Sequence, residues 1–205
     1  GISAPRIYSR EMLKKKIEIC HKHEVKAFIA GDVTEMAVMQ GVFDDYLQET
    51  MDIGADGVEV ATAQVYMDMT EKCLLVEKAA KTGLQVFGEV GKKGLGFWNV
   101  PPNYISKEMK ALKEAGSYKL IVQGEGVLEG VDEINDKPLF EIAARHDVAD
   151  IVFQAKDNRA HTWLIQNFGL EVNMDVESEQ VVVVELCRRG IRKRGLFGLI
   201  SGAKE

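Results

Sequence analysis

Short apolar runs alternate with longer amphipathic segments along the chain. In residues 10–25 the apolar side chains, among them Leu13 and Ile17, recur at helical spacing with charged residues between them. Residues 25–32 then form a mostly apolar run, which predicts a buried strand that ends at Gly31 and Asp32. The same order of helix and strand repeats along the chain. The predicted strands are centred near Phe28, Val58, Phe87, Ile121, Val152 and Val172.

The predicted strands recur about every 30 residues, which is the length of one βα unit. Strands that alternate with amphipathic helices are typical of a parallel sheet covered by helices. Two folds share this periodicity, an open doubly wound sheet and a closed barrel. The G-x-G-x-x-G turn of dinucleotide-binding sheets is absent after the first predicted strand, and the glycines of residues 91–96 do not have its spacing. The sequence therefore favours an α/β fold of the (β/α)8 TIM-barrel type.

The composition is that of one globular domain over residues 1–205. Hydrophobic residues make up 46% of the chain, enough to fill one sizeable core. A net charge of -6 argues against nucleic acid or an anionic membrane as a partner, because such binders carry a basic surplus. No apolar run reaches the roughly 18 residues of a membrane span and no signal segment opens the chain, so we expect a cytoplasmic protein. The cysteines and histidines lack the spacing of a disulfide framework or a metal motif, and nothing indicates an organic cofactor.

Polar side chains lie where each predicted strand ends, and in a barrel the carboxyl ends of the strands carry the chemistry. In chain order these residues are Asp32, Glu59, Glu89, Lys92, Lys93, Gln123, Glu125, Gln154, Lys156, Asn173 and Asp175. A polar side chain in an apolar strand is costly to bury without a partner, so their convergence suggests a shared wet pocket. The simpler interpretation, that any barrel rim is polar, stays open for each single residue.

The number of predicted strands is too small for a closed barrel. A complete barrel has eight strands and typically about 250 residues, whereas this chain has six predicted strands and opens with a loop that leads into a helix. We therefore expect about two βα units to be missing at the amino end. Three explanations are open: the chain is a fragment of a longer one, another subunit completes the wall, or the wall is open. We expect a homo-oligomer.

Four segments carry a resemblance to a known family. They are AGDVTEMAVMQGVFDDYLQETMDIGADGVEV, GEVGKK, ADIVFQAKDNRAHTWLIQNFGLEVNMD and VELCRRGIRKRGLFG. In this order they resemble segments of the phosphosulfolactate synthase family, which includes the plant heat-stress-associated proteins. The resemblance runs from about Ser9 to Gly198, and Glu-Val-Gly-Lys-Lys is its most specific part.

The resemblance implies a (β/α)8 barrel and a magnesium-dependent Michael addition of sulfite to phosphoenolpyruvate, giving a phosphosulfolactate for coenzyme M synthesis. The chain is then expected to be a carbon-sulfur lyase that uses Mg2+ and a small anionic substrate. The family begins with two strands before the segment that matches residues 1–8. Truncation at the amino end is therefore the favoured explanation of the strand deficit.

The Glu-Val-Gly-Lys-Lys segment holds the residues that we expect to be catalytic. Addition at C3 of an enolpyruvate builds negative charge as an aci-anion that must be protonated at C2, and a metal and an ammonium group can serve these two needs. The resemblance implies that Lys92 donates the proton, that Lys93 contacts the anion, and that Glu89 belongs to the same catalytic group. Two solvated loop lysines are the plainer alternative.

Further rim residues are expected to bind the metal or the substrate. Candidate magnesium ligands are Glu59, Glu125, Asp175 and Asp32. Candidate substrate-binding residues are Lys156, Arg188, Gln154, Gln123 and Asn173. The chain departs from the family by having amides at Gln123 and Gln154 in place of carboxylates, and Glu125 in place of an arginine; an amide is a poor substitute for a carboxylate around a hard dication. Two hypotheses follow: a divergent lyase acting on an enolpyruvate, and a catalytically altered paralogue that works as a stress-associated or scaffolding protein.

Overall fold

The computed structural model describes residues 8–62, 65–91 and 102–191. Within these ranges it contains a six-stranded, fully parallel sheet in the order β1-β2-β3-β4-β5-β6. The strands are β1 (Phe28–Ile29), β2 (Gly57–Val60), β3 (Gln85–Val90), β4 (Lys119–Val122), β5 (Ile151–Gln154) and β6 (Asn173–Asp175). Each predicted strand centre lies inside its strand except Val172, which comes one residue before β6.

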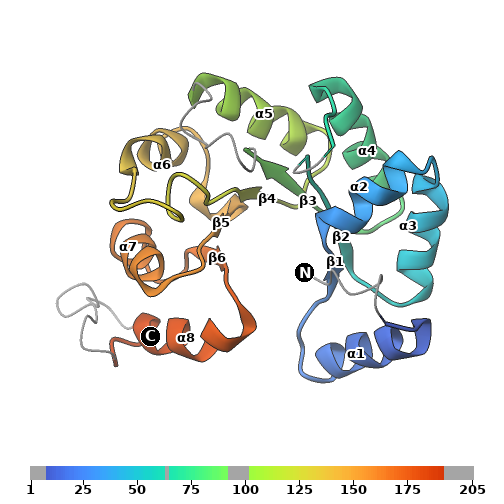
Figure 1. The fold of residues 1–205 in the computed structure, drawn as a ribbon, viewed down its shortest axis with the longest axis horizontal. Helices are drawn as coiled ribbons and strands as arrows, with labels where there is room; N and C mark the ends of the chain where they lie inside the picture. Colours follow the sequence, from blue (N-terminus) through green and yellow to red (C-terminus); the bar gives the residue numbers. More distant parts are fainter. Residues whose placement is uncertain (1–7, 63–64, 92–101, 192–205) are drawn as a thin grey trace.

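Helices cover one side of this sheet, which curls so that the helices lie on its outside (Figure 1). They are α1 (Arg10–Lys22), α2 (Gly31–Met39), α3 (Phe43–Asp52), α4 (Met69–Lys81), α5 (Pro102–Glu114), α6 (Asp136–Ala143), α7 (Asn158–Phe168) and α8 (Val181–Arg188). Over the described residues β1 and β6 are the edges of the sheet, and α1 and α8 stand at the two ends of the curl (Figure 1). The fold is therefore α/β, with the topology of a partial TIM-type barrel; the expected additional strands stay a prediction.

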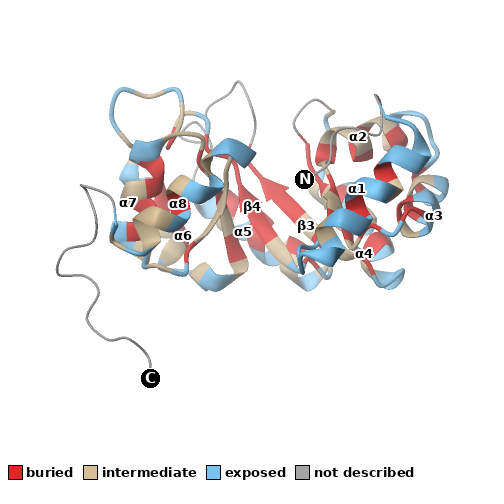
Figure 2. Cartoon of the chain, turned by 90° about the horizontal axis from the view of Figure 1, so that it is seen from below, coloured by how far each residue is buried: buried red, intermediate tan, exposed pale blue. Residues whose placement is uncertain are grey.

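The two faces of the sheet differ in burial because successive side chains of a strand point to opposite sides. On the outer face Val58 pairs with Val86, and Gly88 pairs with Leu120. The side chains of Val58, Val86 and Leu120 are at most 1% exposed beneath the helices, and the buried residues of β3 and β4 form a continuous band in Figure 2. Gly88 permits close packing of α5, since a Cβ there would lie 3.2 Å from Leu112 Cδ1.

The inner face carries aromatic residues towards the amino ends of the strands. Phe28 stacks on Phe87 with ring centroids 4.3 Å apart, and Tyr118 meets Phe87 edge to face at 5.8 Å. Phe28 and Phe87 are half-buried and Tyr118 is exposed. Because side chains alternate, Glu59 and Glu89 lie on this same inner face, closer to the carboxyl ends.

The first βα unit differs from the expectation. β1 is only two residues long, and Gly31 and Asp32 belong to the first turn of α2 rather than to a strand. Gly31 is required by close packing at this point, because a Cβ there would come within 2.5 Å of Ala61 Cβ. The helix begins so soon after the strand that Asp32 is carried on a helix end at the mouth of the curl.

Local signals explain three other helix starts, those of α1, α4 and α7. Ser9, Asp68 and Asp157 are N-cap residues whose side chains accept hydrogen bonds from backbone N–H groups of the first turn. The three cysteines are free thiols and half-buried. None of the described helices combines the length and apolar character that a membrane span requires.

Candidate functional site

Five predicted site residues lie on the inner face at the carboxyl ends of the strands. The register pairs Glu59 with Phe87, and Glu89 with Ile121, so both glutamates point to the inside of the curl. Gln154 is paired with Asp175 at the ends of β5 and β6. Gln123 follows β4 directly, two residues after the inward-facing Ile121. The shared orientation follows from the parallel register, which places residues of equal height on one side of the sheet.

Glu89 and Gln123 form the buried centre of this group. Glu89 is 4% exposed and Gln123 1% exposed, and Gln123 Nε2 donates to Glu89 Oε1 over 3.1 Å. The backbone N–H of Gly124 donates to Gln123 Oε1 at 3.1 Å and to Gln154 Oε1 at 3.3 Å. The amide of Gln123 thus donates to the carboxylate and accepts from the backbone. A carboxylate at position 123 lacks the donor that this arrangement uses.

Lys156 and Asp175 form a second group at the end of β5 and β6. Lys156 Nζ lies 3.3 Å from Asp175 Oδ2 and 3.3 Å from Glu177 Oε1. Burial lowers the pKa of Lys156, but the two carboxylates outweigh it, so its pKa is raised above the ordinary value. The ammonium group therefore stays charged and brings a positive charge to the rim.

Glu59 and Asp32 border a third group, around Tyr46. Thr34 Oγ1 donates to the backbone carbonyl of Glu59 over 2.6 Å and bonds the Tyr46 hydroxyl at 2.9 Å. Burial raises the pKa of Tyr46 well above its usual range, and the charges of Glu59 and Asp32 raise it further. The phenol therefore remains protonated and serves as a neutral hydrogen-bonding group beneath the two carboxylates.

Three predicted residues lie away from this inner group. Asn173 opens β6 rather than ending it, and its amide donates to the carbonyls of Ala149 and Ile151, before and at the start of β5. Arg188 Nη2 donates to Val172 O, also at the amino end of β6. The expectation that Asn173 ends its strand at the mouth is therefore wrong, and Arg188 braces the same opposite end. Glu125 is exposed on the loop after β4, where it forms an isolated bridge with Glu129.

The two lysines that the sequence predicts to be catalytic, Lys92 and Lys93, lie outside the described residues. Within residues 8–62, 65–91 and 102–191, no three His, Cys, Asp or Glu side chains gather closely enough to hold a metal ion. The carboxylates there do not fit a magnesium site by themselves, because Asp175 pairs with Lys156 and the carboxylate of Glu89 accepts from the amide of Gln123.

A buried lysine was missed by the sequence interpretation. Lys72 of α4 is 1% exposed and contacts Glu108, Thr62 and the backbone of Glu89. The available signal was its position in the helix, three residues after Met69 and four before Val76, which places a lysine on an apolar stripe.

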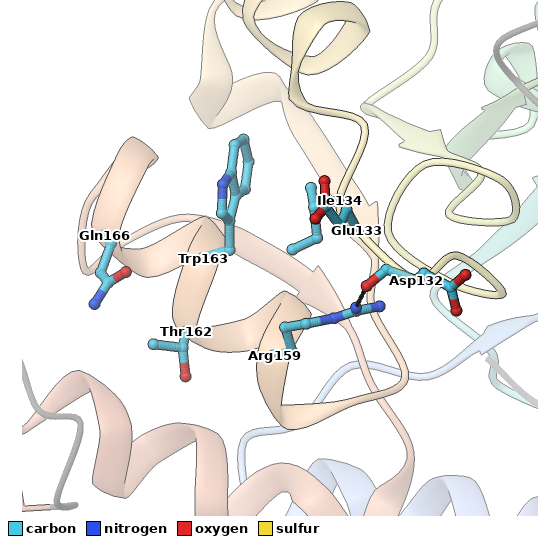
Figure 3. A pocket seen from close by; sticks show the side chains of 7 residues that line it. All are labelled: Asp132, Glu133, Ile134, Arg159, Thr162, Trp163 and Gln166. Carbon is cyan, nitrogen blue, oxygen red and sulfur yellow. Dashed lines mark hydrogen bonds between the residues drawn. The ribbon is translucent and has the colours of Figure 1, made fainter.

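A separate hollow of about 720 Å3 lies outside the curl, between the loop that precedes α6 and the exposed side of α7 (Figure 3). It is lined by Asp132, Glu133, Ile134, Arg159, Thr162, Trp163 and Gln166. Arg159 ties the loop to the helix by donating to the carbonyls of Val131 and Asp132. Trp163 packs on Phe168 with ring centroids 5.6 Å apart. None of the lining residues belongs to the inner face of the sheet.

Fold and site together define an α/β protein of partial TIM-barrel topology, with acidic, amide and ammonium groups at the carboxyl ends of its strands. The sequence pattern of the (2R)-phospho-3-sulfolactate synthase (ComA) family matches residues 1–194, and the chain belongs to this family. The predicted family is thus confirmed.

Individual relatives are distant. Phosphosulfolactate synthase of Methanocaldococcus jannaschii is 24% identical over 206 residues, covering 94% of this chain and 80% of that protein. Protein HEAT-STRESS-ASSOCIATED 32 of Arabidopsis thaliana is 23% identical over 206 residues, covering 88% and 71%. A crystal structure from Burkholderia cenocepacia J2315, provisionally assigned as a phosphonomutase, superimposes with a TM-score of 0.54 at 11% identity and covers 88% of this chain and 76% of that one. This last similarity concerns the fold alone.

Proposed function

We propose that the chain is a lyase of the phosphosulfolactate synthase type, which adds sulfite or a related nucleophile to phosphoenolpyruvate or a similar enolpyruvate. Family membership supports a lyase-type role. The observation that carries the proposal is the placement of Glu89. Its side chain is held on the inner face by Gln123, two residues before the Gly91 turn that leads into Lys92 and Lys93.

The proposed reaction forms a C–S bond at C3 and a C–H bond at C2, and it breaks the π bond between C2 and C3 and one N–H bond of Lys92. The sulfur lone pair attacks C3, a C–S bond forms, and the electron pair of the C2–C3 double bond moves towards the carboxylate as an aci-anion. Lys92 then donates a proton to C2, and Lys93 contacts the anion. A positioned ammonium stabilises this charge and supplies the proton, which is worth about 10²- to 10⁴-fold in rate for general acids.

The test follows the sulfite-dependent loss of enol absorbance with phosphoenolpyruvate, in the presence and absence of Mg2+. We expect activity in the wild type and a loss of roughly 10²-fold or more in Lys92→Ala. Lys22→Ala, at an exposed position of α1, is the matched control and is expected to leave the rate unchanged. Wild-type protein that is folded yet turns over no enolpyruvate with sulfite, with or without Mg2+, contradicts the proposal.

A second candidate is a catalytically altered paralogue that acts as a stress-associated or scaffolding protein. The amides at Gln123 and Gln154, where the family has carboxylates, favour this alternative, because an amide can neither act as a base nor replace a carboxylate charge. Titration calorimetry with Mg2+ and with phosphoenolpyruvate separates the two candidates. Binding of neither ligand, together with no turnover, supports the paralogue.

A further inference from the structure

Lys72 is a charged side chain in the interior of the described fold, on the helix side of the sheet. Its side chain is 2% exposed, and that of its partner Glu108 of α5 is 12% exposed. Lys72 Nζ lies 2.9 Å from Glu108 Oε1, 3.2 Å from Thr62 Oγ1 and 2.5 Å from the carbonyl oxygen of Glu89. All three protons of the ammonium group thus have an acceptor.

The bond to Glu89 lies at the carboxyl end of β3. The ladder between β2 and β3 ends with the pair of Val60 and Gly88, so β3 continues beyond the end of β2. In this last part of β3 the Glu89 carbonyl accepts from Lys72, whose ammonium group also donates to Thr62 and Glu108. The lysine therefore ties the carboxyl end of β3 to the chain that follows β2 and to α5.

Glu89 is consequently held from both sides of the sheet. Its carbonyl is fixed by Lys72 from the helix side, and its carboxylate receives the amide of Gln123 on the inner face. Gly91, which follows with φ of 96°, lines the same small hollow of about 50 Å3 as Lys72 and Glu108. Lys72 thus lines the same hollow as the residue that directly follows β3.

A contribution to stability alone does not explain why Lys72 and Glu108 form a buried ion pair. Burying two charges carries a desolvation cost that their attraction often fails to offset, and apolar replacements of buried ion pairs are frequently neutral or stabilising. A short, directional contact to one backbone carbonyl, in contrast, restricts where the strand end can lie. Displacement of a catalytic group by about 1 Å can cost on the order of 100-fold in rate.

We propose that Lys72 is a positioning residue, which fixes the carboxyl end of β3 and so holds Glu89 in its place on the inner face. The proposal rests on the function proposed above in that Glu89 is taken as part of the reacting site. Lys72 itself acts from behind the sheet, through the backbone of Glu89, and is not placed in contact with the substrate.

The test removes both buried charges together, so that Glu108 is not left as an unpaired carboxylate. The variant is Lys72→Met/Glu108→Gln. Its matched control is Lys78→Met/Asp44→Asn, which removes an exposed ion pair between α4 and α3, with side chains 53% and 69% exposed. We expect the buried-pair variant to lose roughly 10- to 100-fold in kcat with little change in KM, while the control keeps both.

A second measurement does not depend on turnover. With 13C-labelled glutamate carboxyl groups, the resonance of Glu89 is assigned by its absence in Glu89→Gln, and its chemical shift is followed against pH. We expect the resonance and its titration to move in Lys72→Met/Glu108→Gln and to stay in place in the control. If the ion pair only stabilises the fold, its removal is expected to lower Tm without shifting the resonance of Glu89.

The outcomes separate the inference from the function on which it rests. An inactive wild type overturns the proposed function, and the Glu89 resonance then decides on Lys72 alone. A folded buried-pair variant with wild-type kcat and an unmoved Glu89 signal overturns the positioning role. If this variant does not fold, Lys72→Arg takes its place, since it keeps the charge beside Glu108 but presents a planar head to the Glu89 carbonyl; unchanged kcat and an unchanged signal overturn the inference there too.

Discussion

Replacing Gln123 by glutamate restores a carboxylate that the family resemblance places there, and its consequence can be worked out from one contact. The amide nitrogen of Gln123 lies 3.1 Å from Glu89 Oε1, and both side chains are nearly inaccessible to water. In Gln123→Glu two carboxylate oxygens face each other at this separation. A hydrogen bond to a charged group is lost, and a repulsion takes its place.

The repulsion is large enough to change protonation. Two unit charges centred about 4 Å apart repel by about 4 kcal/mol at an effective dielectric constant near 20. This corresponds to roughly 3 pKa units on one of the two carboxyl groups. The two carboxyl groups therefore share one proton at pH 5. At pH 8, in the absence of a cation, they either move apart or both ionise, and either change lowers the free energy of unfolding. The expected loss of stability at pH 8 is about 3–4 kcal/mol, or roughly 10 °C in Tm for a chain of this size.

Thermal unfolding at pH 5 and pH 8, with and without Mg2+, checks this prediction. We expect the Tm deficit of Gln123→Glu to grow between pH 5 and pH 8, and Mg2+ to reduce it at pH 8 if the restored carboxylate completes a cation site. Gln123→Leu is the matched control, because it removes the hydrogen bond to Glu89 without adding a charge; its deficit is expected to grow less between pH 5 and pH 8 than that of Gln123→Glu. A Gln123→Glu deficit that is equal at both pH values refutes the reasoning.

Two further predictions concern the neighbourhood of the site. Gly31→Ala is expected to lower the free energy of unfolding by about 1–3 kcal/mol through overpacking, because the new Cβ would come within 2.5 Å of Ala61 Cβ. Urea unfolding measures this loss of stability. The double variant Gly31→Ala/Ala61→Gly should recover part of it, and no recovery would contradict the assigned contact. Burial raises the pKa of the Glu129 carboxyl above 4.5, and the positive charge of Lys156 partly opposes this shift. Ionisation of Glu129 therefore costs more free energy in the folded state than in the unfolded state. As a result, this residue lowers the free energy of unfolding as the pH rises through the window above 4.5. Glu129→Gln is expected to remove that part of the fall, and identical stability–pH curves for the two proteins would count against it.

The periodic part of the fold was accessible from sequence because it depends on local patterning. Apolar runs and helix-end signals placed five of the six strand centres inside their strands. The first unit was misjudged for a physical reason. The apolar run continues to Gly31, but the strand has already ended, because α2 begins at Gly31 and packs closely on Ala61 there. Close packing between elements is not visible in a pattern along one segment.

The site was predictable to the extent that it follows from strand register. Glu59, Glu89, Gln154 and Asp175 share the inner face because residues of equal height in parallel strands point the same way. The predicted position of Asn173 was wrong because β6 has only three residues, so a shift of two residues moves a side chain from one end of the strand to the other. Lys72 was missed for a different reason. Its hydrogen-bond acceptors come from three separate segments of the chain, so no local sequence motif indicates them.

The charges of the inner face bear on the choice between the two candidate functions. Among the described residues there, Glu59, Glu89 and Asp175 are acidic, and the ammonium of Lys156 already pairs with Asp175 and Glu177. A phosphorylated enol acid carries several negative charges, so its transfer to this face is unfavourable unless further positive charge accompanies it. The Lys92–Lys93 pair, or a bound cation, must then supply that charge if the lyase proposal holds. The affinity for phosphoenolpyruvate should accordingly depend on both lysines and decrease steeply with ionic strength; an affinity insensitive to both would leave the acidic inner face as a feature of a protein with another role.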